Sequence, residues 1–350
     1  MFPLSGSWWV EYDLPRASPG ILFKLLFKSQ KVLKSMESRP KSDLTENLDI
    51  PTMPHSTSQG RAVTPAEARL IERAETAFIT AQIDAGRQVY PEDGFLAESI
   101  GGGVAAVTKL SFGRKLNHVA GIGMERPVTD KDIEDIERLF KAIGVQPEIN
   151  LCPFAHSSAV EVLKKRGYMI CAEMNVYALS LRDYEAEDGS YHEDGECKQT
   201  KGNDIDITPV SKEDHALFIR FSTTGFASAG SPNPDLFHTL ATIATLRPDT
   251  RLYVAKIDGK IAGTAGLALI TTSLGKVAEL YIDSTLPEFR GRGVQVALLK
   301  ARLAEAKRDG YDIAAVTTWP GGVSARNMER VGFKLAYRKD VFTPGSPGCG

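Results

Sequence analysis

The sequence predicts an α/β protein of mixed type, built from two related halves, and three observations lead to this. The chain has 350 residues, and at roughly 100–200 residues per domain this length favours two domains. Segments typical of strands and helices alternate twice, before and after an acidic stretch at residues 182–204. Both halves end alike, because Gly167-Tyr168 and Gly332-Phe333 each follow a short helix and enter a last strand. This echo indicates a duplicated fold.

Composition excludes several classes of protein. The formal net charge is −2, so the chain has no excess positive charge for a globally basic nucleic-acid binder. Hydrophobic residues make up 42%, as in soluble globular chains, and no apolar run approaches the ~20 residues that span a bilayer. No CxxC pair occurs among the four cysteines, which are Cys152, Cys171, Cys197 and Cys349. We therefore expect free thiols, no metal site and a reducing, cytoplasmic location.

Residues 1–62 differ from the rest of the chain. Pro, Ser and Thr dominate residues 38–58, which predicts a poorly ordered extension without a core. The alternative is a basic amphipathic helix on a membrane surface, because residues 21–34 combine apolar side chains with lysines and no acid. The start lacks positive charge ahead of an apolar run, so we expect no secretory leader and no stable membrane insertion.

The first half, residues 63–181, opens with a clear helix signal. Thr64-Pro65-Ala66-Glu67 combines an N-cap threonine, a proline at the first helical position and a glutamate at N3, which together form a capping box. The helix is predicted to end at Gly86. The remaining elements are predicted from periodicity as strands at 103–110, 118–124, 148–152 and 168–181 and helices from 129 and over 157–166.

Residues 182–204 are predicted to form an acidic linker, because acids and glycines replace apolar side chains there. In the second half, residues 205–344, Asp258-Gly259 is a strong turn signal and predicts a hairpin. The other predicted elements of this half are strands at 205–209, 276–283, 313–318 and 333–342 and helices over 212–222, 234–246, 293–308 and 323–331.

An arginine- and glycine-rich turn carries the chemistry. Arg290-Gly291-Arg292-Gly293 lies between a predicted strand and the helix that begins at Val294. Free amides at a helix N-terminus bind anions, and the two glycines permit dihedrals that bring consecutive amides onto phosphate oxygens. A diphosphate is the ligand that this turn predicts, and a tight turn with surface arginines is the alternative. The spacing fits neither a dinucleotide fingerprint nor a P-loop.

This part of the sequence resembles the GNAT (GCN5-related N-acetyltransferase) superfamily, in a form familiar from bacterial members. The family signature is a strand followed by R/Q-x-x-G-x-G/A at the start of a helix. Arg290 and Gly293 match it, and Gln295 replaces the usual small residue. Residues 324–333 resemble the family's penultimate helix and its Gly-Phe exit. The resemblance covers residues 205–343 and implies two tandem GNAT-like folds, each with a mixed, mostly antiparallel central sheet flanked by helices.

The resemblance also implies a function. It implies direct transfer of an acetyl group from acetyl-CoA, the co-substrate, to an amine of a small molecule or peptide that the sequence does not identify. Backbone groups of Leu280, Tyr281 and Ile282 would pair with the pantetheine arm as an added strand does. The implied diphosphate-binding residues are Arg290, Gly291, Arg292, Gly293, Val294 and Gln295. Asn327 matches the family's asparagine near the thioester.

Proton transfer involves further residues. A protonated amine must lose a proton before it attacks a thioester, and Glu279, directly before the pantetheine segment, is our candidate base. The alternative is that Glu279 is an ordinary strand carboxylate that faces solvent. Where the family commonly has a tyrosine acid, this chain has Met328, which cannot donate a proton. Tyr337 or solvent is then left as the acid, or the thiolate leaves without one.

The first half lacks the motif. Its corresponding segment, residues 125–130, contains no Arg-x-x-Gly, and Pro127 removes an amide donor. We infer a degenerate GNAT-like half without cofactor that shapes the substrate cleft or supports the fold. His118 is interpreted as a structural residue, and Cys152 and Cys171 as buried apolar ones. Trp319, before Pro320, is interpreted as a core residue, and the alternative is that it lines an acceptor pocket.

Two other functions stay open, a non-catalytic acyl-CoA-binding module or sensor and a nucleotide- or phosphate-binding protein. A homodimer is also left open.

Overall fold

The structure, a computed structural model, describes residues 63–185, 205–228 and 233–345. The predicted extension, residues 1–62, and most of the predicted linker, residues 182–204, lie outside the described residues. The described parts of both halves belong to one compact unit, so the division into two domains at the linker stays a prediction.

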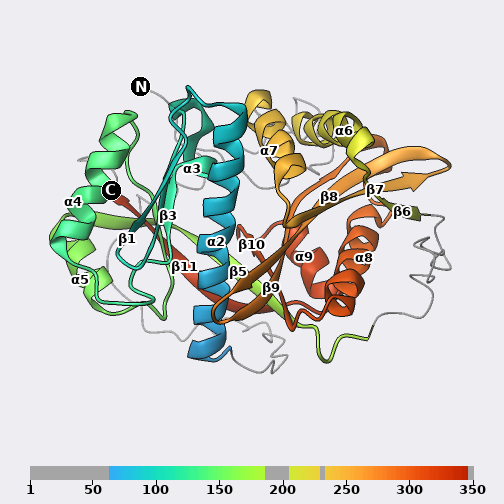
Figure 1. The fold of residues 1–350 in the computed structure, drawn as a ribbon. Helices are drawn as coiled ribbons and strands as arrows, with labels where there is room; N and C mark the ends of the chain where they lie inside the picture. The colour runs from blue at the N-terminus through green and yellow to red at the C-terminus, as the bar shows by residue number, and fades with distance from the viewer. Residues whose placement is uncertain (1–62, 186–204, 229–232, 346–350) are drawn as a thin grey trace, which may run out of the picture. The chain divides into compact units, whose positions relative to one another are not determined.

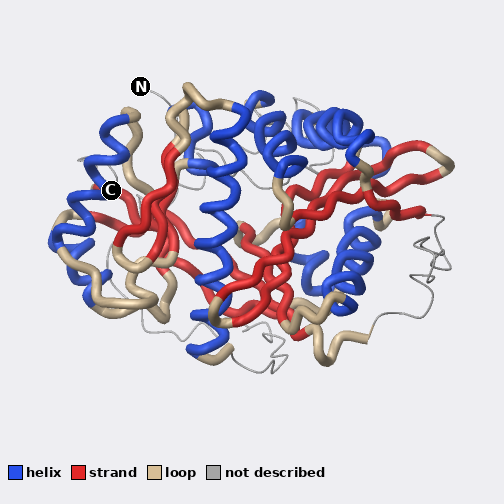
Figure 2. The backbone as a smooth tube through the Cα atoms, viewed as in Figure 1, coloured by secondary structure: helices blue, strands red, loops and turns tan. Residues whose placement is uncertain are grey.

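A sheet of eleven strands runs through both halves (Figures 1 and 2), in the order β1-β2-β3-β4-β11-β5-β10-β9-β8-β7-β6. The strands of the first half are β1 (Leu96–Ile100), β2 (Gly103–Val107), β3 (His118–Ala120), β4 (Ile149–Leu151) and β5 (Tyr168–Ser180). Those of the second half are β6 (Ile205–Pro209), β7 (Thr250–Ile257), β8 (Lys260–Thr272), β9 (Gly275–Thr285), β10 (Ile313–Thr318) and β11 (Lys334–Pro344). Most neighbours are antiparallel, and the pairs β3–β4 and β9–β10 are parallel. The predicted mixed, mostly antiparallel sheet flanked by helices is confirmed.

The last strands of the two halves are exchanged. β5 of the first half pairs with β10 of the second, and β11 of the second half pairs with β4 of the first. The two exchanged strands also pair with each other along most of their length. Each half therefore supplies the strand that completes its neighbour's sheet, and no unpaired edge is left in the middle.

The helices of the first half are α2 (Pro65–Val89), α3 (Gly113–Leu116), α4 (Asp130–Ala142) and α5 (Ser158–Lys165). Those of the second half are α6 (His215–Ala227), α7 (Pro234–Leu246), α8 (Val294–Arg308) and α9 (Val323–Arg330). The predicted capping box of α2 is present, with Thr64 N donating to Glu67 Oε2 at 2.8 Å. The predicted end at Gly86 is wrong, because the helix continues to Val89. Gly86 serves packing instead, since a Cβ there would lie 2.4 Å from Phe95 Cε1.

Helices cover both faces of the sheet. Figure 1 shows α2 crossing the middle of the sheet, and its buried side chains contact strands of both halves. On the same face, α6 and α7 pack beside α2. The opposite face is covered by α4 and α5 in the first half and by α8 and α9 in the second. Alternate residues of β9 confirm the two layers, because Leu280 packs with α8 and Tyr281 packs with α2.

A buried charged cluster connects α2 of the first half to β11 of the second. Lys339 Nζ lies 2.7 Å from Glu72 Oε1, and both side chains are 0% exposed. Lys339 also pairs with Glu75, and the Tyr337 hydroxyl donates to Glu72 at 2.7 Å. Burial lowers the pKa of Lys339, but the two carboxylates outweigh it and the net shift is upward. We call Glu72, Glu75, Tyr337 and Lys339 the buried cluster.

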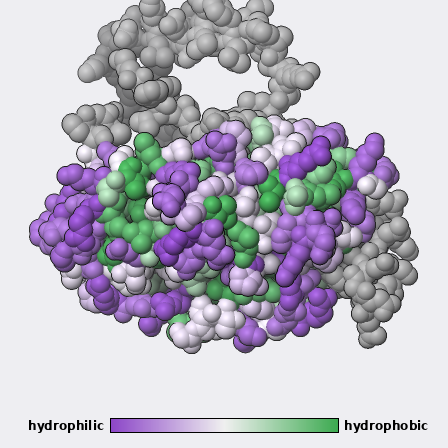
Figure 3. All heavy atoms as spheres, turned by 45° about the horizontal axis from the view of Figure 1, so that its top comes forward, coloured by the Kyte–Doolittle hydropathy of each residue, from purple (hydrophilic) through white to green (hydrophobic). Residues whose placement is uncertain are grey.

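One of the two expectations about buried cysteines is wrong. Cys152 is buried as predicted, whereas Cys171 is exposed, in a stretch of β5 where Met169 and Ile170 are exposed too. On the face drawn in Figure 3, hydrophilic side chains cover most of the surface and hydrophobic ones form separate patches. Within the described ranges, none of the helices has the length and apolar character needed to cross a membrane.

Candidate active site

The two parallel strands β9 and β10 separate at the centre of the sheet. Their pairing ends at Glu279 and Ala315. Beyond this point β10 stays with β5 as far as Thr318, while β9 stays with β8. Residues 280–283 and 316–318 diverge and line one cavity. Two separated strand edges are suited to an extended ligand that pairs with one of them.

A β-bulge in β9 lies at the point of separation. The pairing of β8 with β9 shifts register between Thr264 and Gly266, and Ile282 has a φ of 54°. Left-handed backbone is rare and strained for a β-branched residue, and such strain is typical of functional sites. Tyr281 and Ile282 consequently both pack toward α6 and α7. Gly266 makes room, since a Cβ there would lie 2.9 Å from Ile282 Cγ2.

Arg302 of α8 holds the bulge from the other face of the sheet. Its side chain is fully buried, and Nη1 donates to the carbonyl oxygen of Gly266 at 2.7 Å and to Asp283 Oδ2 at 3.1 Å. Burial raises the pKa of Asp283, although the charge of Arg302 opposes this shift. One guanidinium therefore ties β8 to β9 on both sides of the bulge.

The arginine- and glycine-rich turn leads into an open helix N-terminus. Gly291 has a φ of 73° and Gly293 a φ of 84°, values that favour glycine. Gly293 is the N-cap of α8, and no side chain caps this end. The Ala297 amide makes the first intrahelical bond, to Gly293 O at 3.0 Å. The amides that precede it, together with the helix dipole, make this end suited to an anion.

The predicted polar residues around this turn make hydrogen bonds with neighbouring helices. The Arg290 guanidinium donates to Gly225 O and Ser228 Oγ, both at 3.4 Å, at the end of α6. Asn327 Nδ2 donates to Gln295 Oε1 at 2.7 Å, and Gln295 Nε2 donates to Ser324 Oγ at 3.3 Å. Gln295, which stands where the family usually has a small residue, thus ties α8 to α9.

The first half has the same strand arrangement but a closed site. β3 and β4 are also parallel neighbours, yet the His156 amide donates to Gly123 O at 2.8 Å just beyond them. The N-terminus of α4 carries its own carboxylate, because Asp132 accepts from the Thr129 amide at 2.8 Å. Arg126 neutralises Asp132 and lowers the pKa of its carboxyl. In the first half, side chains of the chain itself therefore bond the helix-start amides, whereas the corresponding amides of α8 are left open.

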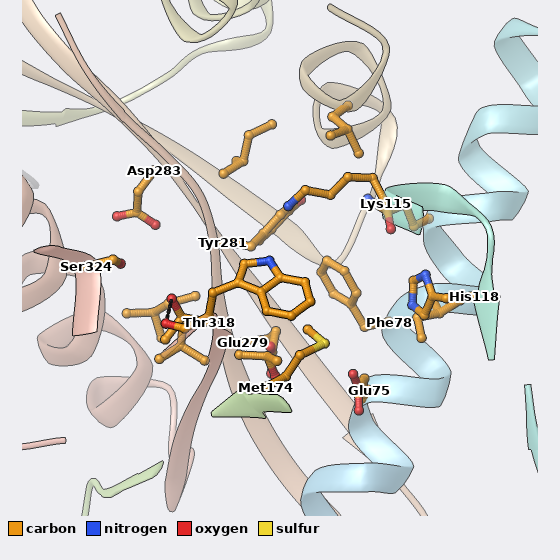
Figure 4. A pocket seen from close by; sticks show the side chains of 18 of the residues that line it. Glu75, Phe78, Lys115, His118, Met174, Glu279, Tyr281, Asp283, Thr318 and Ser324 are labelled. Carbon is orange, nitrogen blue, oxygen red and sulfur yellow. Dashed lines mark hydrogen bonds between the residues drawn. The ribbon is translucent and has the colours of Figure 1, made fainter. Parts of the chain in front are cut away.

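Both halves line the cavity that begins at the separated strands (Figure 4). Its volume is about 160 Å³, comparable to cavities that hold an aromatic molecule. The second half contributes residues 279–283, 316–319 and Met328, and the first half contributes parts of α2, α3, β3, β4 and β5. Much of the wall is apolar, with Phe78, Ile79, Met174, Phe226, Phe237 and Leu240.

The structure places Glu279 in this cavity and not on a solvent-facing side of the strand. Burial raises the pKa of its carboxyl well above the ordinary value, and the negative charge of Glu75 raises it further. Lys339 and Arg247 oppose the shift. A carboxylate with a raised pKa inside a cavity is suited to accept a proton near neutral pH.

Sequence reasoning missed Glu75, Lys115 and His118 as residues of the cavity and gave Trp319 this place only as an alternative. The nitrogen His118 Nδ1 lies 3.0 Å from the Arg114 carbonyl oxygen, which can only accept, so Nε2 is left as the acceptor of the ring. Burial lowers the pKa of His118 and favours its neutral form. The indole Nε1 of Trp319 is buried and makes no hydrogen bond with the described residues. Trp319 lines the cavity directly after β10, which agrees with the alternative that the sequence left open for it.

The two acid candidates lie in different places. Met328 is buried and lines the cavity, so the family's tyrosine position is occupied by a side chain without a proton to give. Tyr337 does not line the cavity, and its hydroxyl donates to Glu72. Of the three alternatives for the acid, this position favours solvent or a thiolate that leaves without an acid over Tyr337. Among the described residues, Tyr281 is the one tyrosine in the wall, with its hydroxyl 2.9 Å from Thr250 Oγ1.

Comparison with known proteins identifies the class. Residues 217–333 match the model of the Acetyltransferase (GNAT) family, which identifies this part of the second half as a GNAT region. This match supports acyl transfer as the general class of reaction. A search of curated proteins finds no match.

Solved structures of similar fold include three that cover most of the chain. A GCN5-related N-acetyltransferase from Kribbella flavida is 17% identical, with a TM-score of 0.49, over 78% of this chain and 96% of that one. A tandem GNAT protein from the clavulanic acid biosynthesis pathway is 13% identical, with a TM-score of 0.49, over 78% and 96%. A GCN5-related N-acetyltransferase from Sphaerobacter thermophilus is 16% identical, with a TM-score of 0.44, over 81% and 94%. Scores this low carry no inference about activity.

Proposed function

We propose that the protein is an N-acetyltransferase that transfers an acetyl group from acetyl-CoA directly to an amine. The observation that carries this proposal is the separation of β9 from β10, which leads to the uncapped, glycine-rich N-terminus of α8 inside the part that matches the family. The first half has equivalent strands but a capped helix and a closed gap. The contrast favours a single cofactor site, in the second half.

Acetyl-CoA suits this site by its chemistry. The diphosphate would meet the amides of Val294 and Gln295 and the charge of the turn. The pantetheine arm carries amide groups, which would pair with the backbone of residues 280–282 as an added strand. The acetyl end would then face the cavity, where Glu279 lies. Holding donor and acceptor together in one cavity supplies much of the rate by proximity.

The proposed chemistry needs one base. Glu279 takes a proton from the acceptor's ammonium group, and the neutral nitrogen attacks the thioester carbon. The C–N bond forms, and the C–S bond breaks as the tetrahedral adduct collapses. A thiol has a pKa of roughly 8.5, so coenzyme A can leave as a thiolate without an acid. This removes the need for a tyrosine at the position of Met328.

A thiol-release assay with acetyl-CoA and a panel of amines tests the proposal. Glu279→Gln should lower kcat by roughly 100-fold or more, the usual contribution of a general base, and leave acetyl-CoA affinity unchanged. Glu161→Gln, on the exposed side of α5, is the matched control and should behave like wild type. Binding of acetyl-CoA with no release across the panel would favour the acyl-CoA-binding module. Competition by ATP but not by coenzyme A would favour a nucleotide- or phosphate-binding protein.

A further inference from the structure

Charges in the cavity are arranged with opposite signs on different elements. Its carboxylates are Glu75 of α2, which belongs to the buried cluster, Glu279 of β9, and Glu148 and Asp283, which are paired with Arg114 and Arg302; Lys115 comes from α3. Figure 4 shows Lys115 extending across the cavity toward Tyr281, with Glu75 and Glu279 on the other side of the opening in this view. A ligand that fills the cavity therefore meets negative charge in one place and positive charge in another.

The negative region lies beside the separated strands. Glu279 is the residue at which the pairing of β9 with β10 ends, and Glu75, whose charge helps to raise the pKa of Glu279, lines the same cavity. Within the buried cluster, Lys339 forms an ion pair with Glu75. A positively charged amine would be attracted here, next to the acetyl group of the proposed donor.

The positive region is built by three neighbouring donors. Arg114 precedes Lys115 on α3, donates to Glu148 at 2.9 Å, and places its guanidinium 5.0 Å from the centre of the Trp319 ring. Trp319 therefore borders the same region, and its buried Nε1 makes no hydrogen bond with the described residues. A buried donor without a protein acceptor normally donates to a ligand or to a water molecule.

Two further facts favour an anion at this place. Burial and the charge of Arg114 lower the pKa of Lys115 well below its ordinary value, and an anion beside the amine would offset both effects. An indole nitrogen is a donor only, so an acceptor group, such as a carboxylate oxygen, satisfies Trp319 and at the same time lies near the amine of Lys115.

We propose that the acceptor is an amino carboxylate with an apolar side chain, that is, an amino acid or a close derivative of one. Its ammonium group lies at Glu279 and Glu75, its carboxylate at Lys115 and Trp319 Nε1, and its side chain against the apolar wall formed by Phe78, Phe226, Phe237 and Leu240. This inference rests on the proposed acetyl transfer and names the substrate class for it.

The reaction balances with these groups. The ammonium group loses one proton to Glu279, the nitrogen attacks, and the C–S bond breaks to release coenzyme A. The second proton of the nitrogen leaves as the adduct collapses and ends on the thiolate or in solvent. The product is an N-acetyl amino acid, whose neutral amide is no longer held by the two carboxylates, while its carboxylate stays attracted to Lys115.

The test compares acceptors that differ by one group. Wild-type protein is assayed with L-leucine against 3-methylbutylamine and with L-phenylalanine against 2-phenylethylamine, and we expect higher kcat/KM for the amino acid of each pair. Lys115→Met should lower kcat/KM for the amino acids by roughly tenfold to a hundredfold, as expected for losing a charge-assisted hydrogen bond. The loss should be several-fold smaller for the decarboxylated amines, which have no carboxylate to bind, and Lys115→Arg should restore part of the loss for the amino acids.

Further variants and a binding measurement keep the outcome clear. Trp319→Phe should lower kcat/KM for the amino acids selectively, by less than Lys115→Met does. An equal loss for both members of each pair, or a wild-type preference for the decarboxylated amines, would overturn the inference while leaving acetyl transfer intact. If no amine is acetylated, calorimetry of L-leucine with the coenzyme A complex decides: binding that depends on Lys115 keeps the site, and its absence overturns it.

Discussion

Replacing Lys339 with methionine removes the ammonium group that lies between two carboxylates of α2. Methionine has nearly the same length, so the change deletes charge and leaves packing almost intact. Because Lys339 and Glu72 are both 0% exposed and 2.7 Å apart, the variant leaves a buried carboxylate with the Tyr337 hydroxyl as its donor. Breaking a buried pair in this way costs about 3–5 kcal/mol of unfolding free energy.

The loss of unfolding free energy in Lys339→Met should be larger at high pH than at low pH. Burial raises the pKa of the Glu72 carboxyl, and Lys339 is the charge that most opposes this shift. Without Lys339 the pKa of Glu72 rises further, so the carboxyl is neutral at acidic pH, where it needs no counter-ion. The difference in stability between wild type and variant should therefore grow as pH rises.

Thermal and denaturant unfolding, both followed by circular dichroism, measure this difference across pH. We expect a fall in melting temperature of about 10 °C at neutral pH. Lys164→Met, on the exposed side of α5, is the control and should unfold like wild type. Glu72→Gln combined with Lys339→Met should regain part of the loss, because it removes the stranded charge. The reasoning is refuted if Lys339→Met stays within about 1 kcal/mol of wild type at every pH, well below the value of a buried pair.

Two further predictions concern titrating groups. The kcat/KM for acetyl transfer should fall as pH decreases through the raised pKa of Glu279, since a protonated carboxyl cannot accept a proton; a profile that Glu279→Gln leaves unaltered would contradict this assignment. Iodoacetamide should alkylate Cys171, which is exposed, and spare Cys152, because burial raises the pKa of the Cys152 thiol to about 12. Peptide mass spectrometry of the native protein reads out both sites, and equal labelling would count against the fold around β4.

Local signals in the sequence predicted the elements that depend on neighbouring residues. The capping box at Thr64 gave the start of α2, and Asp258-Gly259 gave the β7–β8 hairpin, with both turn residues at positive φ. Gly86 misled the prediction of the end of α2, because the need for a glycine came from Phe95, a contact that helix propensity does not encode. The exchange of β5 and β11 could not be predicted, since a strand pattern shows which face is buried but not which strand lies beside it.

The residues of the candidate site also fall into two groups, those that the sequence indicated and those that it did not. The turn from Arg290 to Gln295 is continuous in sequence, so its spacing alone indicated an anion site. Glu279 followed from its place directly before the pantetheine segment. Lys115, His118 and Glu75 belong to the other half, and only the shared sheet brings them into the cavity. Scattered residues of this kind have no spacing from which to recognise them.

The central claim is that α8 and the separated strands bind acetyl-CoA, and isothermal titration calorimetry of three proteins tests it most directly. Gly293 and Gly310 have similar left-handed backbones, with φ of 84° and 74°, at the start and just beyond the end of α8. Aspartate at either position adds the same charge and comparable backbone strain. Only Gly293→Asp places this charge and strain at the proposed diphosphate site. We predict that wild type and Gly310→Asp bind acetyl-CoA equally and that Gly293→Asp binds at least tenfold more weakly, about 1.4 kcal/mol. Equal binding by Gly293→Asp, or no binding by wild type, would contradict the claim.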